Sequence, residues 1–211
     1  MKTLKKISSQ PLRVEDPDTI WLCTSRCIRS ELWFVNNPEL EERIASFLAK
    51  YVEKYKAELF AYYLLGNHYH LEIRFPLANK SAFFKDFNAR IAESVRKLAP
   101  GFESGPLFER RYTPQILADD ETVEDKFFYT WLQPVTTELC ARVSDYPAKC
   151  YFSDAVRGIE RDYKYFAYSE YNEARKRDPQ VSRAKFWKTH TLRFVRLPEY
   201  EALPDLSLIH I

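Results

Sequence analysis

The stretch Leu64–Phe75 reads LLGNHYHLEIRF and holds two of the four histidines in the chain, separated by a single residue. Successive side chains of a β-strand point to opposite faces, so one face of this stretch is polar. That face carries two imidazoles, a carboxylate and a guanidinium, from His68, His70, Glu72 and Arg74. The other face is apolar and is expected to look into the core: Tyr69, Leu71, Ile73 and Phe75. Because hydrophobic burial alone would not select the polar grouping, we interpret it as a candidate functional site.

The flanking sequence predicts an antiparallel α+β sandwich of the ferredoxin-like type, with helices packed on one face of the sheet. Gly66-Asn67 is a turn signal that joins the histidine strand to the preceding apolar run as a hairpin. Apolar residues at three- and four-residue spacing mark the helices. Around the histidine strand we expect a strand at 20–28, a helix at 38–56, a strand at 58–65, a helix at 81–98, a strand or extended hairpin at 107–117, and a helix from Asp119 or Asp120 to about Gln133, which Pro134 ends or kinks.

The chain after Gly158 differs in composition from the part before it. Arg157–Arg196 contains eleven Lys or Arg and five Asp or Glu, a surplus of six positive charges, whereas the whole chain carries +2. A basic surface that faces a polyanion and a solvated helix face both fit this pattern. We therefore predict a core domain, 1–156, and a basic, aromatic, mainly helical C-terminal extension, 157–211. The ending LSLIHI is similar to translated sequencing-adapter sequence, so we expect the extension to be truncated.

Composition narrows the class of protein. A chain of 211 residues with 45% hydrophobic residues fits one ordinary domain and argues against intrinsic disorder. The amino-terminal residues have no apolar core for a signal peptide, and the longest apolar run, 59–65, is too short to cross a bilayer. We expect a cytoplasmic protein without a membrane segment, with reduced thiols at Cys23, Cys27, Cys140 and Cys150.

Two features of the sequence could carry chemistry. A His-x-His pair on a strand can hold a divalent metal if further ligands come from elsewhere, although surface or hydrogen-bonded histidines are the commoner outcome. In the helix DKFFYTWLQP, Tyr129 and Gln133 are four residues apart and share a face. The hydroxyl could act as a nucleophile and the amide carbonyl could coordinate a hard cation. The alternative is that Tyr129 packs like the other thirteen tyrosines.

Four ordered blocks resemble one known family. LLGNHYHLEI, GPLFERRYTPQIL, FFYTWLQPV and SDYPAKCYF stand in the order and approximate spacing of the single-tyrosine HUH transposases, most like the REP-associated tyrosine transposase group. RCIRSELWF is similar to the amino-terminal block of that group, and the resemblance covers about 21–152. The sequence departs from the family at Gln133-Pro134, where Asn-Pro is usual, and mildly at Tyr69, between the histidines.

The resemblance implies an activity and a site. It implies metal-dependent nicking and joining of single-stranded DNA through a 5′-phosphotyrosine, with Tyr129 as the catalytic residue and residues 1–156 as the catalytic domain. It also implies that His68, His70 and Gln133 bind Mg²⁺ or Mn²⁺. Glu72 is a further candidate, either as a ligand or as a neighbour that orients a histidine.

The partner implied is single-stranded or hairpin DNA, bound by a monomer or a homodimer. We expect the contacts to DNA to come from the basic extension and from Arg26, Arg74, Arg110 and Arg111, with Tyr112 and Trp131 as stacking platforms. Two alternatives remain open at this point. One is a module that grips a nucleic-acid hairpin without cutting it, and the other is a replication-initiator or relaxase nuclease of the same superfamily.

Overall fold

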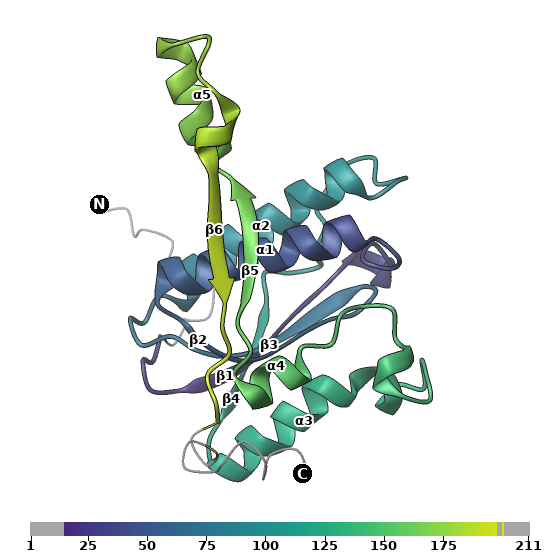
Figure 1. Ribbon diagram of the computed structural model, residues 1–211. Helices are drawn as coiled ribbons and strands as arrows, with labels where there is room; N and C mark the ends of the chain where they lie inside the picture. The colour runs from purple at the N-terminus through teal and green to yellow at the C-terminus, as the bar shows by residue number, and fades with distance from the viewer. Residues whose placement is uncertain (1–14, 198–199, 201–211) are drawn as a thin grey trace, which may run out of the picture.

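The computed structural model describes residues 15–197 and residue 200. Its centre is a four-stranded antiparallel sheet in the order β2-β3-β1-β4 (Figure 1). The strands are β1 (Ile20–Arg26), β2 (Glu58–Leu64), β3 (His68–Arg74) and β4 (Thr113–Leu117). The helices α1 (Pro38–Tyr55) and α2 (Lys80–Leu98) connect β1 to β2 and β3 to β4. This order of strands and crossovers is the ferredoxin-like arrangement, so the predicted α+β fold is confirmed.

The alternation along β3 determines which helices it meets. Its odd-numbered residues pack against α2, as Tyr69 does on Phe87 with ring centroids 5.4 Å apart. Its even-numbered residues face α3 (Asp120–Thr136), with the His70 and Tyr129 rings 5.9 Å apart. The sequence predicts helices on one face of the sheet; the structure places α1 and α2 there and adds α3 on the other. Apolar α3 side chains such as Val123 and Phe127 are buried by this packing.

Most predicted elements differ from the observed ones by only a residue or two. The larger difference lies before β4, where the predicted strand 107–117 shortens to Thr113–Leu117 plus one isolated bridge between Cys27 and Phe108. The helix α3 continues through Pro134 to Thr136, because a proline in the last turn removes only one donor. Among the described residues, no helix combines the length and the apolar character needed to span a membrane.

The extension is not mainly helical as predicted. After α4 (Phe152–Arg157), β5 (Arg161–Phe166) and β6 (Trp187–Leu192) pair as an antiparallel hairpin. The helix α5 (Tyr168–Arg177) and a short 3₁₀ turn, η3 (Arg183–Phe186), form its tip, which projects beyond α1 and α2 in Figure 1. Residues 161–192 are called the arm below. The hairpin forms because its aromatic residues bury against the body, as Tyr165 does on Phe47 at 5.7 Å.

Candidate metal and nucleic-acid site

The polar face of β3 is buried rather than exposed. The exposed fractions are 8% for His68, 5% for His70 and 0% for Glu72. Strand alternation predicts that these residues lie on a face away from the core. That prediction is wrong, because α3 covers this face. The resulting layer between β3 and α3 keeps the histidines largely out of water while the rest of the sheet remains an ordinary hydrophobic core.

Each histidine is oriented through its Nδ1 atom. The His68 Nδ1 donates to Asn67 Oδ1 at 2.6 Å, and the His70 Nδ1 shares a hydrogen bond with Thr24 Oγ1 at 3.0 Å. The two rings lie 5.0 Å apart at a steep angle. The His70 Nε2 is buried and has no hydrogen-bond partner among the residues that the structure describes. This is the pattern of metal-binding imidazoles, in which one nitrogen is held by the protein and the other is left for the ion.

Burial also sets the protonation of this layer. It lowers the pKa of His68 to about 4 and that of His70 to about 3, helped by the positive charge of Arg26 and, for His70, by His68. Both imidazoles are therefore neutral near pH 7, the form that binds a metal. Burial raises the pKa of Glu72 well above its ordinary value, and in the described part of the chain neither carboxyl oxygen has a hydrogen-bond partner.

The helix α3 brings Tyr129 to the histidines. Asp119 caps the helix by accepting a hydrogen bond from the Thr122 amide at 2.7 Å. Tyr129 then lies edge-on to His70, and its side chain is 40% exposed. The Lys126 ammonium lies 5.1 Å from the centre of the tyrosine ring, and Gln133 is buried one turn after it. A partly exposed tyrosine, a lysine ammonium that is paired with Asp125, and two neutral imidazoles are thus gathered at one place.

The donor set can hold a divalent cation only if an amide takes part. Among the described residues, His, Cys, Asp and Glu form no group of three or more that could bind a metal ion. Two imidazole nitrogens with the carbonyl oxygen of Gln133 are a mixed nitrogen and oxygen set that suits Mg²⁺ less well than Mn²⁺. The unpartnered His70 Nε2 fits this use, because a buried polar atom without a partner is otherwise costly.

Three of the predicted DNA-binding arginines lie together. Arg26 is opposite His68 in the sheet, and its carbonyl accepts from the Glu109 amide at 3.0 Å, which places the Arg110–Arg111 loop beside it. All three arginine side chains are exposed. This end of the sheet, next to the histidines, therefore presents a basic surface.

The other three predicted DNA contacts are in the wrong place or have another partner. Arg74 is at the far end of β3 and forms an ion pair with Glu58 at 2.5 Å. Tyr112 is buried with its ring stacked on Phe84 at 4.1 Å. Trp131 is buried in the core among aromatic rings, including Tyr63 at 6.1 Å. Neither ring is open to a base, because tertiary packing uses both.

The sequence analysis missed the residues that orient the site. Thr24 lies on the first strand, opposite His70, and only the register of β1 against β3 reveals the contact. Asn67 was interpreted as a turn residue, although its side chain also holds His68. Lys126 could have been found, since it lies three residues before Tyr129 on the same helix and residues at that spacing are neighbours.

Comparison with known proteins supports the architecture. No protein-family model and no curated protein matches the chain. The chain is similar to a solved structure of a REP-associated tyrosine transposase bound to a REP hairpin, with a TM-score of 0.56 and 15% sequence identity. The alignment covers 68% of this chain and 82% of that one. What the two share is the fold. At this identity the similarity supports the arrangement of sheet and helices. Any chemistry has to be argued from the residues described above.

Proposed function

We propose that this protein nicks and rejoins single-stranded DNA beside a hairpin, as a transposase of the REP-associated type. The observation that carries the proposal is the position of Tyr129, partly exposed and 5.9 Å from a His70 ring whose Nε2 has no partner. A structural neighbour that is a tyrosine transposase bound to a REP hairpin supports the choice of reaction and of DNA.

The reaction begins at the Tyr129 hydroxyl. The phenolic oxygen attacks a backbone phosphorus, the bond to the 3′-oxygen breaks, and the products are a 5′-phosphotyrosine and a free 3′-hydroxyl. A 3′-hydroxyl can reverse the step and join strands without ATP, because the covalent link conserves the phosphodiester. The Lys126 ammonium lies 5.1 Å from the centre of the ring and is paired with Asp125 at 2.7 Å; released from that pair, it would favour the negative charge that develops on the phenolic oxygen.

The remaining side chains bind and orient. His68, His70 and Gln133 would hold a Mg²⁺ or Mn²⁺ ion that neutralises charge on the scissile phosphate. Glu72 is not included, because among the described residues it forms no metal-binding group with the two histidines. Thr24 and Asn67 fix the imidazole rings. Arg26, Arg110 and Arg111 would contact the DNA backbone at the adjacent end of the sheet.

The test is an adduct assay. The protein is incubated with hairpin DNAs carrying single-stranded flanks and with Mg²⁺ or Mn²⁺, and covalent complexes are separated under denaturing conditions. We expect an adduct on Tyr129 by mass spectrometry, lost in Tyr129→Phe and retained in the control variant Tyr171→Phe, whose ring lies on α5 against Phe166 and Phe186. Hairpin binding without any adduct would identify a non-catalytic binding module, and cleavage only of other single-stranded origins would identify a nuclease of the initiator or relaxase kind.

A further inference from the structure

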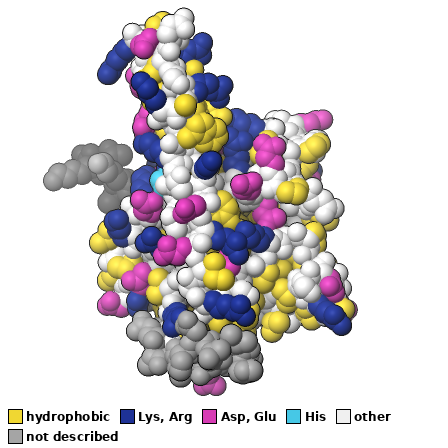
Figure 2. Space-filling view, in the orientation of Figure 1, with side chains coloured by type: hydrophobic (Ala, Val, Ile, Leu, Met, Phe, Trp, Pro, Cys, Tyr) yellow, Lys and Arg dark blue, Asp and Glu magenta, His cyan; other side chains and the backbone are white. Residues whose placement is uncertain are grey.

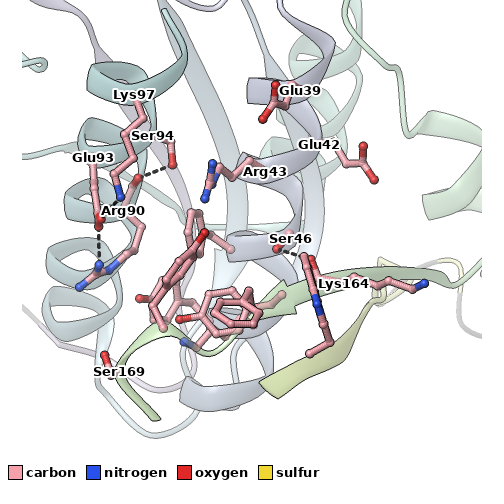
Figure 3. A pocket seen from close by; sticks show the side chains of 17 residues that line it. Glu39, Glu42, Arg43, Ser46, Arg90, Glu93, Ser94, Lys97, Lys164 and Ser169 are labelled. Carbon is pink, nitrogen blue, oxygen red and sulfur yellow. Dashed lines mark hydrogen bonds and ion pairs between the residues drawn. The ribbon is translucent and has the colours of Figure 1, made fainter. Parts of the chain in front are cut away.

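A hollow lies on the other side of the sheet from Tyr129. It has a volume of about 450 Å³, within the roughly 300–1,000 Å³ of small-molecule sites, and is bounded by α1, α2 and the part of the arm where β5 passes into α5 (Figure 3). One stripe of α1 forms a wall, with Arg43, Ser46, Phe47 and Lys50 at helical spacing. The hollow is not used by the proposed nicking reaction.

Aromatic rings of the arm form a second wall. Phe166 is at the centre, with Trp187 at 5.2 Å and Tyr168 at 4.6 Å between ring centroids. The two outer rings remain open: the exposed fractions are 56% for Trp187 and 46% for Tyr168. Large aromatic side chains exposed this far, at the edge of a hollow, are suited to stack on a flat ligand.

The cations of this hollow differ in how they are paired. Arg90 and Lys97 on α2 both form ion pairs with Glu93. Within the described part of the chain, Arg43 has no hydrogen bond or ion pair, and Figure 3 shows it reaching from α1 toward α2. The Lys50 ammonium lies 3.8 Å from the centre of the Tyr165 ring, and it too forms no hydrogen bond or ion pair with a described residue. Two carboxylates, Glu39 and Glu42, lie at the rim.

The arm adds positive charge and holds its wall in place. Residues 161–192 include eight Lys or Arg and four Asp or Glu, and Figure 2 shows basic side chains around the upper end of the arm. His190 bonds to Glu53 on α1 at 2.8 Å, and Ser46 donates to the Lys164 carbonyl at 3.4 Å. These contacts fix the aromatic wall against α1, so the hollow is formed before any ligand arrives.

We propose that this hollow binds single-stranded nucleic acid, with an unpaired base stacked on Trp187 and Tyr168 and its phosphates held by Arg43 and Lys50. Exposed rings on the basic arm, next to the unpaired cations of α1, match the alternating bases and phosphates of a single strand. Paired bases of a duplex offer no free face to the rings. The inference rests on the proposed function for the class of ligand and gives the protein a second contact for a strand, separate from the one that is cut.

Trp187 reports on the proposal directly. It is exposed, whereas Trp21 and Trp131 are buried and Trp33 is partly buried. The full chain is titrated with (dT)₁₂ and (rU)₁₂, following indole fluorescence and the anisotropy of labelled oligomers. We expect saturable quenching and salt-dependent binding, and the tighter oligomer identifies DNA or RNA as the preferred strand. A blunt duplex that quenches equally, or single strands that leave the fluorescence unchanged, would overturn the proposal.

Variants separate stacking from charge. Trp187→Phe should keep the affinity within about threefold and lose the quenching, whereas Trp187→Ala should bind about tenfold more weakly. Arg43→Ala with Lys50→Ala should also weaken binding about tenfold. The matched pair Lys85→Ala with Arg96→Ala removes two exposed cations of α2 outside the hollow and should change affinity less than threefold. If both double variants lost the same affinity at an unchanged melting temperature, the proposed site would be wrong.

The wild-type protein also separates this inference from the nicking reaction. A covalent adduct with hairpin DNA but no Trp187 quenching overturns the hollow and leaves the proposed function intact. Quenching by (dT)₁₂ without an adduct on any hairpin supports the hollow and overturns the proposed function.

Discussion

At the scale of single residues, the site depends on hydrogen bonds behind the metal-binding atoms. Thr24 is held by backbone pairing on both sides, to His70 in β3 and to Thr113 in β4. Its hydroxyl therefore lies on a rigid strand, and the His70 ring takes its orientation from the sheet. A metal ligand positioned this way loses little freedom when the ion binds.

Replacing that hydroxyl should weaken metal binding. Thr24→Val keeps the shape of the side chain but leaves the His70 Nδ1 without its partner at 3.0 Å. We expect affinity for Mn²⁺, measured by calorimetry, to fall about 10- to 100-fold. Thr113→Val is the control, because Thr113 lies opposite Thr24, is exposed and has no bond to a histidine. Unchanged Mn²⁺ affinity in Thr24→Val would show that the Thr24 hydroxyl does not position a metal ligand.

Glu72 gives a stability prediction that could not come from the sequence. Alternation places it on the polar face, but only the packing of α3 shows that it is fully buried with both oxygens unpartnered. Without metal, Glu72→Leu should stabilise the fold by about 1–3 kcal/mol, because it removes an unsatisfied buried group. Urea unfolding in EDTA measures this, with Glu72→Gln expected near wild type. Destabilisation by Leu in EDTA would mean that water satisfies the carboxyl.

At the scale of elements, the turn before β3 depends on close packing. A Cβ added to Gly66 would lie 2.6 Å from Val35 Cγ2 and 3.0 Å from Leu32 Cδ2. The backbone of Gly66 is also held at both polar groups. Its amide donates to the Tyr146 hydroxyl at 2.8 Å, and its carbonyl accepts from the Phe34 amide. The turn that leads into β3 at His68 is therefore fixed by the 32–35 loop and by Tyr146, which is far away in sequence.

Gly66→Ala should consequently destabilise the protein by about 1–3 kcal/mol, the usual cost of overpacking. Urea unfolding of Gly66→Ala, Val35→Ala and the double variant forms a cycle. We expect the double variant to lose less than the sum of the single losses, because Val35→Ala removes the clashing atom. Strict additivity would place the strain elsewhere in the turn.

The sequence predicts elements well where one period dominates and poorly where packing decides. The spacing of Leu40, Ile44 and Leu48 predicts α1 to within a residue of its observed end. In the arm, charge and aromatic content suggested helix, yet β5 pairs with β6 because Tyr163 and Tyr165 bury against the body. Tyr112 and Trp131 show the same limit of sequence-based prediction, because the sequence does not distinguish an aromatic residue of the core from one at a binding surface.

At the scale of the whole molecule, the sheet separates two surfaces. Arg26, Arg110 and Arg111 lie at the end of the sheet that also carries His68, whereas the hollow lies on the α1 and α2 side, under the arm. Nearly balanced charge over the whole chain, +2, is thus compatible with strongly basic local surfaces. The salt dependence of DNA binding reports the number of phosphate contacts, so variants in one surface measure the contacts that this surface makes.

The arginine surface makes the last prediction. The affinity falls as salt rises, and each phosphate contact adds about one unit to the steepness of log affinity against log salt concentration. The double variant Arg110→Ala with Arg111→Ala should therefore reduce the magnitude of this slope by about 2 for hairpin DNA. Fluorescence anisotropy across a salt series measures it. Arg74→Ala is the control, because its guanidinium is paired with Glu58 at the opposite end of β3 and should leave the slope unchanged. If Arg74→Ala changed the slope as much as the double variant, the DNA would follow the length of β3 and the surface assigned to Arg26 and its neighbours would be wrong.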